Sequence, residues 1–277
     1  MTKLSDLLTA RFGVSDDIDE PADTWGMIPQ ILGRRTIRRY TDEPVSENLR
    51  RALLACAQSA PSKSDLQQYS IIDIRDDALK SRLAELAGTS AMAVAPVVLV
   101  FCADLRRIMR INELRGHAYT HNNLNAFMNA AVDAALALQS YMLAAEAAGL
   151  GCCAISQVRK RIAETSAALG LPDGVFPVAG LTAGWPGEQR DVTLRLPPSV
   201  VVHRDRYDDA NLAAEIDAYD RRRHTIRPIP EKAQAHPDKF GIAEFYGWSE
   251  NQARRQSVPD DLGGLAAYVT AHGFDLG

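Results

Sequence analysis

The chain has 277 residues, of which 46% are hydrophobic and 24% charged, a balance typical of a globular protein with a sizeable core. Its formal net charge of −4 at pH 7 argues against a nucleic-acid-binding protein, because such proteins present a basic surface to phosphates. No run reaches the roughly 18 apolar residues of a membrane span, and the polar start leads into an acidic segment rather than into an apolar signal core. These features predict a cytoplasmic protein without a membrane or nucleic-acid partner.

Residues 1–33 are expected to form an N-terminal extension. Leu4, Leu7, Leu8 and Phe12 share one face of a short amphipathic segment, and the acidic stretch 16–21 follows it. The patterns beyond Arg34 predict, in order, a helix over 46–59, a strand over 69–74, a helix over 77–86 and a strand over 97–101.

The longest helical pattern covers residues 122–148. Its apolar residues recur at steps of three and four, and its many alanines permit close approach of another element. Two interpretations stay open here: a helix at a subunit interface, or a central core helix of one domain.

The remaining patterns complete an interleaved order of helices and strands. They are a strand at 152–155, a helix at 159–169, strands at 176–183 and 200–202, a helix over about 207–223, and weak helical patterns at 248–256 and 260–271. This order predicts an α+β or α/β sandwich around a mixed sheet. We expect a core at 34–206 and a C-terminal extension at 207–277.

The residue types that usually bind metals are not arranged for that purpose. The four cysteines lie in apolar or alanine-rich runs without CxxC spacing, so buried thiols are expected rather than a zinc site or a disulfide framework. They are Cys56, Cys102, Cys152 and Cys153. His121 and His203 have no partner at metal spacing, and no GxGxxG sequence indicates a Rossmann domain.

The densest charge cluster is the segment 34–40, where four arginines occur within six residues. Planar guanidinium groups match phosphate oxygens two at a time, so this density favours an anionic ligand. A solvated basic surface is the alternative.

This segment is the first of four motifs. Its residues 35–40 fit a basic R-[ST]-x-R-x-[FY] pattern. The second motif is at residues 60–67, which read Ala-Pro-Ser-Lys-Ser-Asp-Leu-Gln. Gly149-Leu150-Gly151 precedes a predicted strand, and Gly184-Trp185-Pro186 is followed by Arg195. In this order and spacing, the four motifs resemble those of the flavin-dependent nitroreductase family, and most closely its larger NADPH-linked branch.

The resemblance implies an α+β fold: a nitroreductase-like three-layer sandwich with a mixed, mostly antiparallel central sheet flanked by helices, assembled as an intertwined homodimer. It also implies an FMN site shared by two subunits. The expected FMN contacts are Arg34, Arg35, Thr36, Arg38, Ser62, Lys63, Ser64, Gln67 and Arg195, together with backbone N–H groups at Ile155, Ser156 and Gln157. Residues 62–64 would reach FMN across the dimer interface, and Arg195 would clamp its phosphate.

The activity implied is ping-pong hydride transfer from NADPH or NADH through FMN to a nitroaromatic, quinone or flavin. Flavin N5 carries the chemistry, so no catalytic side chain is expected. Ser156-Gln157 and Thr193 depart from the family pattern, which leaves a flavin-binding protein without efficient turnover as an alternative. The basic cluster 221–224 is expected either to hold the 2′-phosphate of NADPH or to complement its own helix end.

Overall fold

The computed structural model describes residues 3–14, 26–259 and 264–276, so the acidic stretch 16–21 lies outside the described residues. The chain divides into two compact units. We call Arg35–Arg190 with Asp261–Gly277 the sheet unit, and Met1–Arg34 with Asp191–Asp260 the helical unit. Each unit therefore combines segments that are far apart in the sequence.

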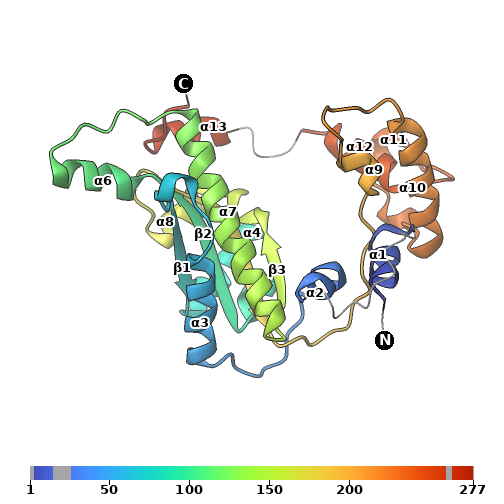
Figure 1. The fold of residues 1–277 in the computed structure, drawn as a ribbon, viewed down its shortest axis with the longest axis horizontal. Helices are drawn as coiled ribbons and strands as arrows, with labels where there is room; N and C mark the ends of the chain where they lie inside the picture. Colours follow the sequence, from blue (N-terminus) through green and yellow to red (C-terminus); the bar gives the residue numbers. More distant parts are fainter. Residues whose placement is uncertain (1–2, 15–25, 260–263, 277) are drawn as a thin grey trace. The chain divides into compact units, whose positions relative to one another are not determined.

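The sheet unit is built on four antiparallel strands in the order β1-β2-β4-β3 (Figure 1). They are β1 (Tyr69–Ile74), β2 (Val97–Asp104), β3 (Gly151–Ile155) and β4 (Val175–Gly184). Every residue of β2 is buried, as in a strand covered on both faces. The antiparallel part of the predicted sheet is confirmed, and a parallel pairing occurs as an isolated bridge between Thr36 and Cys152.

Helices cover both faces of this sheet. On one face, α3 (Glu47–Gln58) and α7 (Leu124–Ala147) bury Leu99 and Phe101 of β2. On the other, α4 (Asp77–Ala87), α5 (Ala91–Val94) and α8 (Ile162–Leu169) pack in the cluster that contains Val98 and Val100. Because alternate strand residues point to opposite faces, β2 joins both clusters. The α+β class, with helices flanking an antiparallel sheet, is confirmed.

The predicted helix starts at 46 and 77 are confirmed by side-chain caps. Ser46 accepts a hydrogen bond from the Leu49 N–H (3.3 Å), and Asp76 accepts one from the Leu79 N–H (2.7 Å). Each side chain satisfies an N–H group that has no partner within the helix.

Helix α7 has two apolar faces. Its buried face is lined by small residues, including Ala126, Ala130 and Ala134, which bring the helix close to the sheet. On another face, large apolar side chains recur every four residues and are exposed: Leu124, Met128, Val132 and Leu136. The helix is therefore a core element that also carries an uncovered apolar stripe in this chain.

The C-terminal residues close one end of the sheet unit. Three phenylalanines pack edge to face, with ring centroids of Phe127 lying 5.3 Å from Phe176 and 5.2 Å from Phe274. Helix α13 (Leu265–Ala271) adds Val269 to the same cluster. The weak helical pattern at 260–271 is confirmed for its described residues, whereas α6 (Arg106–Arg115) was not predicted from the sequence.

The helical unit contains short helices from both parts of the chain. They are α1 (Leu4–Phe12), α2 (Ile28–Gly33), α9 (Pro198–Val201), α10 (Leu212–Ile226), η4 (Glu231–Ala233), α11 (Pro237–Phe240) and α12 (Trp248–Gln256). Arg11, only 5% exposed, donates to the carbonyls of Leu32 (2.9 Å) and Thr193 (3.1 Å). One guanidinium thus ties α1 to the end of α2 and to the segment before α9.

Helices α10 and α12 are joined by two neighbouring residues of α10. The Tyr219 ring lies edge-on to Trp248 with centroids 5.5 Å apart, and its hydroxyl donates to the Leu194 carbonyl (3.3 Å). The buried carboxylate of Asp220 accepts from the Ser249 N–H (3.1 Å) in the first turn of α12.

The strand predicted at 200–202 is wrong. The segment begins with two prolines, and Pro198 occupies the first turn of the short helix α9. A proline is favoured there, because its fixed φ angle suits a helix start and the position needs no N–H donor. The three valines that suggested a strand lie mostly on α9 and at its C-terminal cap.

Candidate functional site

The basic segment 35–40 lies along the edge strand β3. The Ile37 N–H donates to the Cys152 carbonyl (3.1 Å), and Thr36 forms the parallel bridge to the same residue. Ile37 is buried against Gly151, where an added Cβ atom would lie 2.6 Å from the Ile37 Cβ. The second glycine of the Gly-Leu-Gly motif is therefore required by the close approach of this segment.

The far end of the segment is held by Tyr40. Its hydroxyl contacts the Ile37 carbonyl (2.9 Å) and the Thr182 hydroxyl on β4 (2.8 Å). Burial raises the pKa of Tyr40, so the phenol remains a neutral hydrogen-bonding group. The Thr41 N–H donates to the Trp185 carbonyl (2.9 Å), which connects the segment to the Gly-Trp-Pro turn.

Glu188 fixes the backbone between these two ends. Its carboxylate accepts from the N–H groups of Arg38 (2.8 Å) and Arg39 (3.3 Å) and pairs with Arg190 (2.9 Å). The Arg190 hydrogen bond, followed by the backbone hydrogen bond from Arg38, lowers the pKa of Glu188 from its ordinary value of 4.5 to about 2. The backbone is thus anchored while Arg35 and Arg38 are exposed.

The loop 62–67 is held by helix α7 and contains the short helix η2 (Lys63–Asp65). Three non-glycine residues of this loop have positive φ angles: Ser64 (51°), Asp65 (57°) and Gln67 (49°). Such conformations cost on the order of 1–3 kcal/mol each and persist only where the surroundings impose them. The buried carboxylate of Asp133 on α7 accepts from the N–H groups at both sides of this strained stretch, Lys63 and Gln68, at 3.0 Å each.

The end of strand β3 offers backbone donors. Ser156 and Gln157 are exposed at the start of η3 (Ser156–Arg159), whereas Ile155 and Val158 are buried. The first N–H groups of such a helix have no partner within it and are available to a ligand. Gly180 leaves room for this turn, since a Cβ atom there would lie 2.9 Å from the Val158 side chain.

The predicted site residues fall in both units. Within the sheet unit, segment 35–38 lies beside strand β3, residues 155–157 lie at the end of β3, and Asp133 of α7 holds loop 62–67. Arg34 and Arg195 belong to the helical unit, so their convergence with Arg35 and Arg38 stays a prediction.

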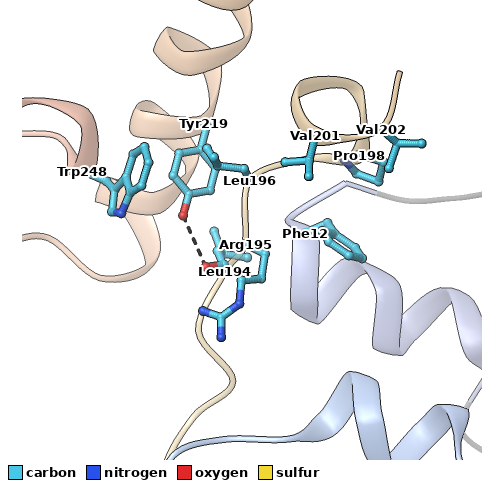
Figure 2. A pocket seen from close by; sticks show the side chains of 9 residues that line it. All are labelled: Phe12, Leu194, Arg195, Leu196, Pro198, Val201, Val202, Tyr219 and Trp248. Carbon is cyan, nitrogen blue, oxygen red and sulfur yellow. Dashed lines mark hydrogen bonds between the residues drawn. The ribbon is translucent and has the colours of Figure 1, made fainter. Parts of the chain in front are cut away.

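Arg195 lines a mainly apolar cavity of about 510 Å³ in the helical unit, together with Phe12, Tyr219 and Trp248. The Arg195 N–H donates to the Arg11 carbonyl (2.8 Å). The exposed side chain of Arg195 extends away from helix α9 (Figure 2).

Comparison with known proteins assigns the family. The sequence profile of the Nitroreductase family matches residues 31–91 and 86–185, and the profile of its C-terminal domain matches residues 194–277. The chain belongs to the nitroreductase family. The resemblance drawn from the four motifs is therefore confirmed.

Relatives match this family member over most of its length. It is 34% identical to an oxygen-insensitive NADPH nitroreductase of Salmonella typhimurium over 85% of this chain and 88% of the relative. It is 36% identical to an FMN reductase (NADPH) of Bacillus subtilis over 85% of this chain and 89% of the relative. These matches confirm the NADPH nitroreductase and FMN reductase branch.

Solved structures of similar proteins agree with this assignment to the nitroreductase family. B. megaterium NfrA2 is similar with a TM-score of 0.81 and 31% identity, covering 91% of this chain and 98% of that one. The NADPH:FMN oxidoreductase from Vibrio harveyi complexed with NAD+ gives a TM-score of 0.77 and 28% identity, covering 90% and 98%.

The basic cluster 221–224 of this nitroreductase family member does not present four equivalent cations. The Arg221 guanidinium lies 5.9 Å from the Phe245 ring centroid, and the His224 ring lies 5.0 Å from the same ring. Arg222 is half-buried, with its side chain beside Gly13. A role for this cluster in holding the 2′-phosphate of NADPH stays a prediction.

The cysteines differ in exposure. Cys102, Cys152 and Cys153 are buried as expected, and burial raises the pKa of Cys102 to about 12. Cys56 is exposed on α3, so the expectation of a buried thiol is wrong there. Among residues 3–14, 26–259 and 264–276, no cluster of three or more metal-ligating side chains is present, and no helix has the length and apolar character needed to cross a membrane.

Sequence reasoning missed two residues that organise the site. Glu188 anchors segment 35–40, and Asp133 anchors loop 62–67. For Asp133 a signal existed, because an acidic residue inside a long apolar and alanine-rich helix requires a partner. Glu188 lies in a polar loop, where a carboxylate is ordinary and gives no such signal.

Proposed function

We propose that this chain is an FMN-dependent oxidoreductase that transfers hydride from NAD(P)H to nitroaromatic, quinone or flavin acceptors by a ping-pong mechanism in the cytoplasm. The observation that carries the proposal is the similarity, over 85% of the chain, to relatives named NADPH nitroreductase and FMN reductase (NADPH). The donor groups of the sheet unit support it.

These donors fit FMN chemically. Exposed guanidinium groups at Arg35 and Arg38 suit a phosphate or an electron-rich ring edge, while the hydroxyls of Ser62 and Ser64 suit a ribityl chain. When bound, FMN supplies the hydride chemistry, accepting from the nicotinamide and passing to the acceptor.

The chain's own side chains and backbone groups are proposed to bind and orient the flavin. Arg38 and the Lys63 ammonium are the proposed cations that stabilise negative charge at the pyrimidine edge of the ring. Backbone N–H groups at 155–157 are proposed to face its N5 and O4 positions. Because the reaction needs no side chain to move a proton in the hydride step, the proposed site contains binding residues and no catalytic acid or base.

The test is a flavin titration followed by anaerobic reduction. Purified protein is expected to be yellow or to take up added FMN, and its visible absorbance should bleach with NADPH and return when a nitroaromatic or quinone is added. Parallel titrations with NADH measure the nicotinamide preference. Colourless protein that takes up no FMN contradicts the proposal.

A second candidate is a flavin-binding protein without efficient turnover. Ser156 and Gln157, which stand where the branch usually has two glycines, are exposed at the start of η3 and place side chains beside the proposed ring position. Such a protein would bleach with dithionite but not with NAD(P)H, and the same titration distinguishes the two.

We also propose that the active form is a homodimer. The exposed stripe on α7 repeats at four-residue steps over three turns, as expected for a helix that packs against another apolar surface. Sedimentation of the wild type and of Val132→Glu tests this: the wild type should sediment as a dimer and the variant as a monomer. A monomeric wild type contradicts it.

A further inference from the structure

A single carboxylate spans the strained loop 62–67. The two oxygens of Asp133 each accept one backbone hydrogen bond, Oδ1 from Lys63 and Oδ2 from Gln68, both at 3.0 Å. Asp133 is only 1% exposed and lies on α7 among buried alanines. An ionised carboxylate accepts but does not donate, so both oxygens are matched to the two N–H groups that bracket the loop.

The loop needs such an anchor because of its backbone conformation. Ser64, Asp65 and Gln67 all have φ angles between 49° and 57°, a region in which side chains are rarely stable without outside support. Within the loop, the Ser62 hydroxyl accepts from the Gln67 N–H (3.2 Å), and the Lys63 ammonium donates to the Ser64 hydroxyl (2.8 Å). These contacts orient the hydroxyl and ammonium groups that the loop presents to solvent.

Arg107 supports only one end of the loop. Its guanidinium donates to the carbonyls of Gln67 (2.7 Å) and Tyr69 (3.0 Å). The Asp133 carboxylate, in contrast, reaches both sides of the strained residues. Burying a charge in a helix of alanines is costly unless hydrogen bonds compensate, and the compensation here comes from the loop's own backbone.

We propose that Asp133 is the positioning residue of the FMN site: by holding Lys63 and Gln68, it keeps Ser62, Lys63 and Ser64 in the arrangement that binds the flavin nucleotide. This inference rests on the proposed function, because FMN is the ligand it assigns to the loop. Asp133 acts through the loop and does not itself contact the ligand.

The first experiment needs no flavin. Hydrogen exchange at the amides of Lys63 and Gln68 is measured in flavin-free wild type, Asp133→Asn and Asp220→Asn. An asparagine retains one acceptor and turns the other into a donor, so exchange at one or both amides should rise by about tenfold or more in Asp133→Asn. Asp220→Asn is the matched control, since it alters another buried, doubly bonded carboxylate and should leave these amides unchanged. Equal exchange in wild type and Asp133→Asn overturns the proposal.

The second experiment measures the dissociation constant of FMN by quenching of flavin fluorescence. Asp133→Asn should raise it about tenfold, equivalent to about 1.4 kcal/mol, with little change in kcat at saturating FMN. If wild type binds FMN and Asp133→Asn binds it equally well, this inference fails while the proposed function stands. If wild type takes up no FMN, the proposed function fails, and the exchange rates alone decide whether Asp133 holds the loop.

A pair of loop variants keeps the test decisive if Asp133→Asn does not fold. Asp65→Gly accommodates the positive φ angle at no steric cost, whereas Asp65→Pro fixes φ near −65° and cannot adopt it. Asp65→Pro should weaken FMN binding by about tenfold or more, and Asp65→Gly should retain it. Equal affinity in the two variants overturns the role assigned to the loop conformation.

Discussion

The two segments of the sheet unit that are proposed to bind FMN are held in different ways. Segment 35–40 has main-chain hydrogen bonds to β3 at one end and to the Gly-Trp-Pro turn at the other, and the Glu188 carboxylate accepts from two N–H groups between them. Loop 62–67 has a strained backbone and depends on one buried side chain of α7. Segment 35–40 thus shares its support between main-chain and side-chain hydrogen bonds, whereas loop 62–67, where the backbone is strained, relies on a carboxylate from α7.

The largest expected effect comes from filling the space that lets segment 35–40 approach β3. Gly151→Val places a side chain where Cβ alone would lie within 2.8 Å of three Ile37 atoms. The variant should lose FMN binding and about 1–3 kcal/mol of stability in urea unfolding, because the segment is pushed from the strand. Gly264→Ala, at a glycine with no atom within 4 Å of the added Cβ, is the control. Unchanged unfolding of Gly151→Val would contradict the close-approach argument.

A smaller effect is expected from Tyr40→Phe. The change removes the hydroxyl that contacts the Ile37 carbonyl and Thr182, leaving those buried groups with one partner fewer. We expect a loss of about 1 kcal/mol in the free energy of unfolding, while loop 62–67 keeps its amide protection. Loss of protection in that loop would show that the two segments are not held independently.

The smallest effect is expected from Glu188→Gln, and it should depend on pH. The folded protein lowers the pKa of Glu188 from 4.5 to about 2, so ionised Glu188 stabilises the fold above pH 4.5, and this contribution is lost as pH falls toward 2. Unfolding at a series of pH values should therefore show wild type more stable near neutrality and the difference shrinking in acid. A difference that is constant with pH would argue against the Arg190 and backbone contacts as its cause.

Much of the sheet unit follows from local sequence. Strands β1 to β4 and helices α3, α4 and α7 were predicted because their periodicity and caps are contained within each segment. Helix α6 is not predicted because four of its ten residues are arginines and none of its side chains is buried in the core. The segment of α9 reads as a strand because its three valines favour one despite the two prolines at its start.

The candidate site was predictable only in part. Motif spacing predicts FMN contacts at residues 35–38, 62–67 and 155–157, and the structure places the first of these segments beside β3 and the last at the end of β3. Asp133 and Glu188 were missed because their bonds join residues 70 and 150 positions apart, which no local pattern encodes. The prediction that Arg34 and Arg195 complete the site requires the placement of one unit on the other.

The discontinuous make-up of both units has a consequence for synthesis on the ribosome. Arg11 donates to Thr193, which is synthesised 182 residues later, and the rings of Phe127 and Phe176 pack on Phe274, which follows both of them in the chain. Neither unit can be completed before its later segment has been synthesised. Until Phe274 has emerged, the rings of Phe127 and Phe176 lack this contact, so the nascent protein is expected to be prone to chaperone binding during that interval.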